Sequence, residues 1–147
     1  MTIMEGKLRM VDTNVLVYIT VESNPWYQEA RQCLNKLFTE GYELCITSQI
    51  IREYLVSLTR SSIFEQRFTL DEALLELNAL LSVFTLLEET KETFSYLYNL
   101  IQKYQIQGKS IHDANIVAVM ITYGIKRLVT YNTDDFRRFS EIILEKI

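Results

Sequence analysis

The 147-residue chain has few residues that interrupt or cross-link a protein: one proline, four glycines and two cysteines. With so little proline and glycine, no stretch has the composition of a linker, and the sequence contains no repeat or low-complexity tract. We therefore expect one domain over residues 1–147, a length sufficient to bury a core. Cys33 and Cys45 have no histidine or cysteine nearby at zinc-ligand spacing, so we interpret both as small core residues.

Long hydrophobic runs are also missing. The apolar stretches are interrupted well before the roughly 18 residues that a membrane span requires. The N-terminus leads into the charged segment Glu5-Gly6-Lys7 without an apolar signal region. We therefore expect a cytoplasmic protein that does not associate with membranes.

The apolar pattern alternates between short runs with strand character and longer runs with helical spacing, which is typical of an α/β domain with a largely parallel sheet. The expected strands cover residues 7–11, 42–47, 84–87, 126–130 and, at the sheet edge, 141–144. The expected helices cover residues 15–19, 25–41, 49–58, 70–81, 92–104 and 111–123. Their predicted N-terminal caps are Asn24, Ser48, Ser110 and a capping box that pairs Thr69 with Glu72.

Four acidic residues stand where a catalytic metal site would need them. Asp12 follows the first strand, Glu53 lies on an early helix, Asp113 opens an apolar helix, and Asp135 follows the strand at 127–130. Carboxylates gathered at strand ends and helix starts can bind a hard divalent cation, and such a cation can activate water against a phosphodiester.

Each acid also has a plain structural interpretation. Asp12 or Thr13 can cap a helix, Asp113 can interact with a helix dipole, and a glutamate on a helix flank such as Glu53 is usually solvated. The place of Asp12 directly after a strand favours a role in ligand binding, because ligands bind beyond the carboxyl ends of parallel strands. Asp113 enters a helix that is apolar nearly all round, where a carboxylate needs a compensating charge. We interpret His112, the only histidine, as structural or solvent-facing.

Glu53 shares a polar stripe of its helix with Gln49, Ser57 and Arg60, so it can face a cleft beside the core. The segment around Asp134 and Asp135 can also be an Asx-type turn that starts a helix.

The net charge of −4 and the pI of about 5.1 argue against binding of nucleic acid through the overall electrostatic potential of the protein. Bound metal would neutralise part of the acidic charge. Phosphate contacts would then depend on local basic residues, and the candidates are Arg52, Arg60, Lys109, Arg137 and Arg138.

Four segments in this order and spacing resemble the PIN-domain nucleases, most closely the VapC-like toxin ribonucleases of prokaryotic toxin–antitoxin pairs. The segments are residues 10–16 (MVDTNVL), 48–53 (SQIIRE), 111–116 (IHDANI) and 128–136 (LVTYNTDDF). The resemblance covers nearly the whole chain. It implies a three-layer α/β/α domain with a parallel sheet of four to five strands in the order 3-2-1-4-5.

The resemblance also implies a site in which Asp12, Glu53 and Asp113 hold Mg²⁺ or Mn²⁺. Family members place a fourth acid either at the position of Asn132 or just before the phenylalanine, so Asp135 takes this role and Asp134 is the alternate. The neighbouring residues expected to orient groups or contact the substrate phosphate are Thr13, Thr130 and Asn132.

The implied reaction is hydrolysis of an RNA phosphodiester by metal-activated water, without a protein nucleophile and with Glu53 as a candidate to orient the water. The family further implies a homodimer and an antitoxin partner. One rival hypothesis is a non-catalytic PIN-like module that binds RNA or protein. Another is a phosphatase with Asp12 as nucleophile, but the Asp-x-Asp pattern of the haloacid-dehalogenase-like enzymes is absent because position 14 is asparagine.

Overall fold

The computed structural model of the chain describes residues 6–60 and 62–147, without the side chain of Lys146. Glu5, part of the charged segment near the N-terminus, lies outside the described residues.

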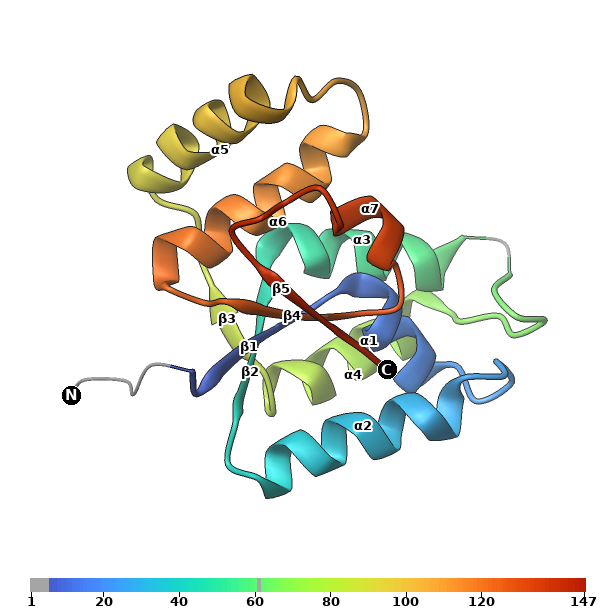
Figure 1. Ribbon diagram of the computed structural model, residues 1–147. Helices are drawn as coiled ribbons and strands as arrows, with labels where there is room; N and C mark the ends of the chain where they lie inside the picture. The colour runs from blue at the N-terminus through green and yellow to red at the C-terminus, as the bar shows by residue number, and fades with distance from the viewer. Residues whose placement is uncertain (1–5, 61) are drawn as a thin grey trace.

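A five-stranded sheet forms the centre of the molecule (Figure 1). Its strands are β1 (Leu8–Val11), β2 (Glu43–Thr47), β3 (Thr85–Leu87), β4 (Arg127–Thr130) and β5 (Ile143–Lys146). They lie in the order β3-β2-β1-β4-β5, and every neighbouring pair is parallel. This arrangement confirms the expected α/β fold and strand order. The buried residues of the central strands β1, β2 and β4 are mostly apolar, because both faces of these strands are covered.

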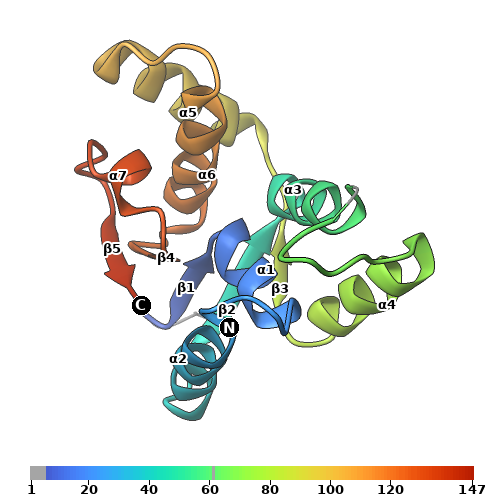
Figure 2. The same ribbon diagram turned by 90° about the vertical axis from the view of Figure 1, so that its right-hand side faces the viewer.

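Helices connect the strands and cover both faces of the sheet. They are α1 (Thr13–Thr20), α2 (Tyr27–Thr39), α3 (Ser48–Thr59), α4 (Leu70–Leu81), α5 (Lys91–Tyr104), α6 (Ser110–Tyr123) and the short α7 (Thr133–Phe136). In Figure 1, α5 and α6 lie above the sheet and α2 and α4 below it. Figure 2 shows the same layers after a quarter turn. Parallel strands require such crossover helices, because a tight hairpin can join only antiparallel strands.

Several predicted helix starts are wrong by one or more residues. Thr47, the last residue of β2, caps α3 in place of Ser48, because its hydroxyl accepts a hydrogen bond from the Ile50 amide at 3.1 Å. Ser110 does not cap α6; it is the first helical residue, after Lys109. The Asn24 side chain accepts a hydrogen bond from the Trp26 amide, so a turn separates it from α2.

The capping box of α4 is confirmed. The Thr69 hydroxyl accepts a hydrogen bond from the Glu72 amide at 3.1 Å, and the Glu72 carboxylate accepts one from the Thr69 amide at 3.0 Å. The edge strand begins two residues later than predicted, at Ile143, because the side chains of Phe139 and Ile142 are buried in the turn before it. Among residues 6–60 and 62–147, every helix is too short or too polar to cross a membrane.

The sheet topology decides where the acidic residues meet. β1 and β4 are neighbours, with Val11 opposite Val129, so the residues that follow these strands emerge side by side at the carboxyl edge. Helix α3 starts at the same edge, directly after β2. Asp12, Glu53 and the segment after Thr130 therefore approach one another although they are distant in sequence.

Candidate active site

Asp12 connects the end of β1 to the start of α1. Its Oδ1 accepts a hydrogen bond from the Thr13 amide at 2.8 Å, so it caps α1. Its Oδ2 accepts hydrogen bonds from the Thr130 hydroxyl at 2.8 Å and the Asn14 amide group at 3.4 Å. The residue is only 6% exposed. Asp12 is thus both a helix cap and a fixed carboxylate at the carboxyl edge of the sheet.

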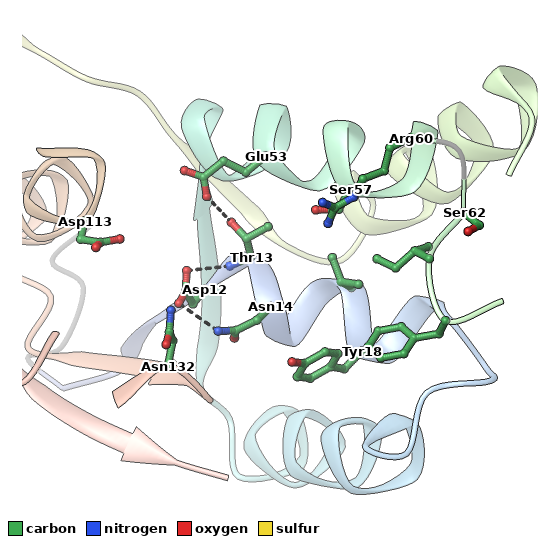
Figure 3. Close-up of a pocket in the computed structure, with 13 residues that line it drawn as sticks. Asp12, Thr13, Asn14, Tyr18, Glu53, Ser57, Arg60, Ser62, Asp113 and Asn132 are labelled. Carbon is green, nitrogen blue, oxygen red and sulfur yellow. Dashed lines mark hydrogen bonds between the residues drawn. The ribbon is translucent and has the colours of Figure 1, made fainter. Parts of the chain in front are cut away.

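Glu53 is held in place from two directions. One carboxylate oxygen accepts a hydrogen bond from the Thr13 hydroxyl on α1 at 2.8 Å (Figure 3). The other accepts one from the Gln49 amide group at 2.8 Å, one turn earlier on α3. Gln49 also donates to the His112 carbonyl at 2.9 Å and accepts from Asn115 at 2.9 Å, both on α6. This network joins three helices around Glu53, and the helical spacing predicts for Gln49 only a place on the same polar stripe.

Asp113 lies in the first turn of α6 and is half-buried. Its carboxylate points toward the space between Asp12 and Glu53 (Figure 3). Within the described chain, this carboxylate accepts no hydrogen bond and forms no ion pair. Asp113 is therefore the carboxylate of the group that is least restrained. The adjacent His112 is exposed, as expected.

Two of these carboxyls hold their protons unusually tightly. The pKa of Asp113 is raised to about 7, first by burial and then by the charges of Asp135, Asp12 and Glu53, while Arg138 opposes the shift. The pKa of Asp12 is raised to about 6, mainly by burial, despite the hydrogen bonds from Thr130 and Thr13. Ionising these two carboxyls is therefore unfavourable, mainly because they are buried and also because their charges repel one another, and an added cation would stabilise the ionised forms.

The two candidates for the fourth acid differ in their surroundings. Asp134 is exposed and pairs with Arg137 at 2.7 Å. Asp135 accepts a hydrogen bond from the Asn132 side chain, and its charge contributes to the raised pKa of both Asp12 and Asp113. Asp135 is thus the acid of this segment that acts electrostatically on the other carboxylates, although it does not line the cleft described next.

A cleft of about 560 Å³ opens beside these residues. The side chains that line it come from α1, α3, the start of α6 and two loops. They are Asp12, Thr13, Asn14, Val17, Tyr18, Glu53, Ser57, Arg60, Ser62, Ile63, Phe64, Asp113 and Asn132. The polar stripe of Glu53, Ser57 and Arg60 faces the cleft, as the helical spacing indicates. Thr130 does not line it, because it is fully buried beneath Asp12.

Sequence reasoning missed the apolar and aromatic part of this cleft. Tyr18 resembles an ordinary core residue of an amphipathic helix, and nothing in the sequence places Phe64 beside it. Of the predicted basic residues, Arg60 lines the cleft, Arg138 acts on Asp113 and Arg137 is paired with Asp134. Arg52 and Lys109 are not among the lining residues.

The donor atoms of the site suit a hard cation, since they are carboxylate, hydroxyl and amide oxygens. The uncompensated charge on Asp12 and Asp113 supports the same fit. However, across residues 6–60 and 62–147, no three acidic, histidine or cysteine side chains converge closely enough to hold one ion. The donor chemistry fits a divalent metal, while a complete set of ligands requires the carboxylates to move closer together.

A parallel five-stranded sheet between helical layers, with an acidic cleft at its carboxyl edge, defines an α/β domain of the PIN type. The chain belongs to the PIN domain family, whose sequence profile matches residues 9–142.

Solved structures show the same fold. VapBC2 from Rickettsia felis, bound to a DNA fragment from its promoter, has a TM-score of 0.71 at 21% identity, covering 95% of this chain and 98% of that one. A toxin–antitoxin complex from Klebsiella pneumoniae has a TM-score of 0.66 at 21% identity, covering 95% and 99%. VapC20 of Mycobacterium tuberculosis, a toxin that cleaves the sarcin–ricin loop, has a TM-score of 0.66 at 16% identity, covering 91% and 98%. At such identities the likeness shows the fold alone. No curated protein matched the sequence.

Proposed function

We propose that the protein is a metal-dependent endoribonuclease that hydrolyses RNA phosphodiester bonds, and that it is the toxin of a toxin–antitoxin pair. The observation that carries the proposal is that Asp12, Glu53 and Asp113 line one cleft. Asp12 caps α1, Glu53 lies on α3, and Asp113 lies in the first turn of α6. Membership of the PIN domain family supports it. So does the similarity to VapC20, a toxin described as cleaving the sarcin–ricin loop.

In this proposal, Asp12, Glu53 and Asp113 hold Mg²⁺ or Mn²⁺, and Asp135 contributes the fourth negative charge. A divalent cation there would lower the pKa of a bound water and neutralise charge on the phosphate. Glu53 is fixed by Thr13 and Gln49, so it can orient a water molecule through its carboxylate. Asp113 has the freedom to move toward the other two acids when the cation is present.

The predicted substrate-binding residues take different roles. Thr13 and Asn132 line the cleft and can contact the RNA backbone. Thr130 is fully buried and gives its hydroxyl hydrogen to Asp12, so we propose that it positions Asp12 and does not touch the substrate.

One observation favours the alternative, a non-catalytic PIN-like module that binds RNA or protein: the described acids do not form a three-ligand metal cluster. The raised pKa values of Asp12 and Asp113 disfavour it, because a module that only binds would gain nothing from carboxylates that repel one another.

A cleavage assay separates the two. The purified protein is freed of metal with EDTA, and an end-labelled RNA is incubated with and without Mg²⁺ or Mn²⁺. We expect cleavage with the metal, and its loss in Asp12→Asn, Glu53→Gln and Asp113→Asn, while Asp134→Asn remains active. Binding of RNA without cleavage under any of these metal conditions would favour the non-catalytic module.

We further propose a cytoplasmic homodimer with a cognate antitoxin. Several leucines on α4 lie exposed at the surface, Leu70 and Leu75 among them at 65% and 69%, which is typical of a protein–protein interface. The similar structures include VapBC and other toxin–antitoxin complexes. Light scattering after gel filtration would test the dimer, and a neighbouring reading frame for a small protein would support the antitoxin.

A further inference from the structure

The cleft has a second end that the acidic residues do not explain. Figure 3 shows Asp12, Glu53 and Asp113 at one end, and Arg60 and Tyr18 on facing walls toward the other. Arg60 is the C-cap of α3 and follows Glu53 by about two helical turns, or about 10 Å at the usual helical rise. This second end is therefore a separate part of the same cleft.

Arg60 provides a positive charge there. Its side chain reaches back along α3 beside Ser57 (Figure 3). Its guanidinium makes no hydrogen bond or ion pair with the described residues. A guanidinium in this situation can bind a phosphate through two parallel hydrogen bonds.

The opposite wall is aromatic. Tyr18 stacks on Trp26 with their ring centroids 4.7 Å apart, and both rings contact Phe64 edge-on at 6.0 and 6.2 Å. Tyr131 packs edge-on against Tyr18, with ring centroids 4.9 Å apart, and also lies 6.2 Å from Trp26. We call Tyr18, Trp26, Phe64 and Tyr131 the aromatic cluster. Within it, Tyr18 and Phe64 line the cleft, and neither ring is fully buried.

The loop that carries Phe64 is built to hold the ring in this place. Ile63 and Gln66 form an antiparallel bridge with two hydrogen bonds of 2.9 Å, and the two residues between them both have positive φ, 48° at Phe64 and 64° at Glu65. Glycine or asparagine is usual at such positions, and a bulky residue there is strained. The Phe64 carbonyl also accepts a hydrogen bond from the Ser23 hydroxyl. A strained phenylalanine fixed at the wall of a cleft is typical of a binding site.

We propose that this end of the cleft is a nucleotide subsite for single-stranded RNA, in which Arg60 binds a backbone phosphate and a nucleobase stacks on the wall formed by Tyr18 and Phe64. The inference rests on RNA as the substrate of the proposed function, but not on cleavage itself. A base can stack on this wall only when it is free of a duplex, which selects single-stranded segments. An uncharged peptide would leave the Arg60 guanidinium without a partner.

Binding is measured with full-length Asp12→Asn protein in the presence of Mg²⁺, so that cleavage does not interfere. The probe is a short single-stranded RNA with 2-aminopurine at successive positions, whose fluorescence is quenched when the base stacks. We expect quenching at one position. Phe64→Asn suits the left-handed backbone but removes the ring, so it should weaken binding about ten-fold and abolish the quenching. Phe64→Trp should restore both.

Arg60→Ala should weaken binding in low salt and reduce the slope of log Kd against log salt by about 1, as expected for one lost phosphate contact. Phe94→Ala and Lys91→Ala on α5, away from the cleft, are the matched controls and should bind like the parent protein. The same RNA annealed to its complement should bind more weakly than the single strand.

Absence of binding by the parent protein, or unchanged quenching in Phe64→Asn together with an unchanged salt slope in Arg60→Ala, would overturn the subsite. If wild-type protein cleaves RNA while these variants bind normally, the subsite is wrong and the proposed function stands. If binding depends on Phe64 and Arg60 but wild-type protein never cleaves, the subsite stands and the ribonuclease proposal fails.

Discussion

Thr130 donates its hydroxyl hydrogen to Asp12 between the two adjacent central strands, with 2.8 Å between Thr130 Oγ1 and Asp12 Oδ2. Both residues are buried, at 0% and 6% exposure. The bond also lowers the pKa of Asp12, opposing the effect of burial. A threonine with no access to the cleft thus sets both the orientation and the acidity of the carboxylate.

Replacing Thr130 with valine tests this relationship. Valine keeps the shape but removes the donor, so we expect the pKa of Asp12 to rise above about 6. The free energy of unfolding should fall by about 1 to 2 kcal/mol, because a buried carboxylate loses a hydrogen bond. An NMR titration of the Asp12 carboxyl carbon and urea denaturation measure the two effects. Thr130→Ser should behave like wild type, and an unaltered titration in the valine variant would contradict this role.

Asp113 makes the stability of the metal-free protein depend on pH. Its pKa is raised from 3.8 to about 7, and that of Asp12 to about 6. The folded protein therefore binds these protons more tightly than the unfolded chain, and the free energy of unfolding should fall as the pH rises from about 4 to about 7. The contribution of these groups is complete at the acidic end of this window and lost above it.

Asp113→Asn should flatten this dependence and raise the free energy of unfolding at pH 8. The expected gain is on the order of 1 kcal/mol, which allows for solvent screening of a half-buried group. Urea denaturation in EDTA at several pH values measures it. Asp134→Asn is the control, because Asp134 is exposed and lies on the neighbouring α7. If the free energy of unfolding of Asp113→Asn had the same dependence on pH as that of wild type, the pKa of Asp113 would not be raised in the folded protein.

Divalent metal should oppose the loss of stability that the metal-free protein shows at high pH. If Asp12, Glu53 and Asp113 share an ion, Mn²⁺ should raise the melting temperature of wild type in proportion to the logarithm of its concentration. The gain should shrink as the pH falls from 8 to 5, because protons on Asp113 and Asp12, with pKa values of about 7 and 6, compete with the metal.

Scanning calorimetry with Mn²⁺ compares the variants. Asp113→Asn and Asp12→Asn should lose most of the gain, Asp135→Asn part of it, and Asp134→Asn none. Crystals soaked in Mn²⁺ should show anomalous density between Asp12 and Asp113. Equal stabilisation of wild type and Asp113→Asn would show that the ion binds elsewhere.

Much of the fold could be predicted, because alternating apolar strands and helices restrict a chain of this length to few arrangements. The resemblance to PIN domains added the strand order and the set of acids. Helix starts were less predictable. At α3, Thr47 and the adjacent Ser48 are both good capping residues, and only the backbone geometry shows that the Thr47 hydroxyl is the one that accepts the hydrogen bond from the Ile50 amide.

The site shows a sharper limit. Spacing on α3 sufficed to place Glu53, Ser57 and Arg60 on one face, because a helix has a fixed period. No such rule applies to Phe64, whose position depends on a turn with positive φ that its sequence does not favour. The resemblance predicted that the three acids share one site, but the distances between their carboxylates could not be read from sequence, because they depend on side-chain rotamers and on charge repulsion.

Glu65 provides a direct test of the strained turn. It is exposed and has φ of 64°, in the left-handed region that favours glycine and asparagine. Glu65→Asn should relieve the strain without the entropic cost of glycine, and raise the free energy of unfolding by about 0.5 to 1 kcal/mol. Urea denaturation measures the change, and Glu22→Asn, an exposed glutamate with ordinary backbone angles, is the control. A loss of stability in Glu65→Asn would mean that the turn does not hold Phe64 in the left-handed conformation, and that the aromatic wall of the cleft is not preformed.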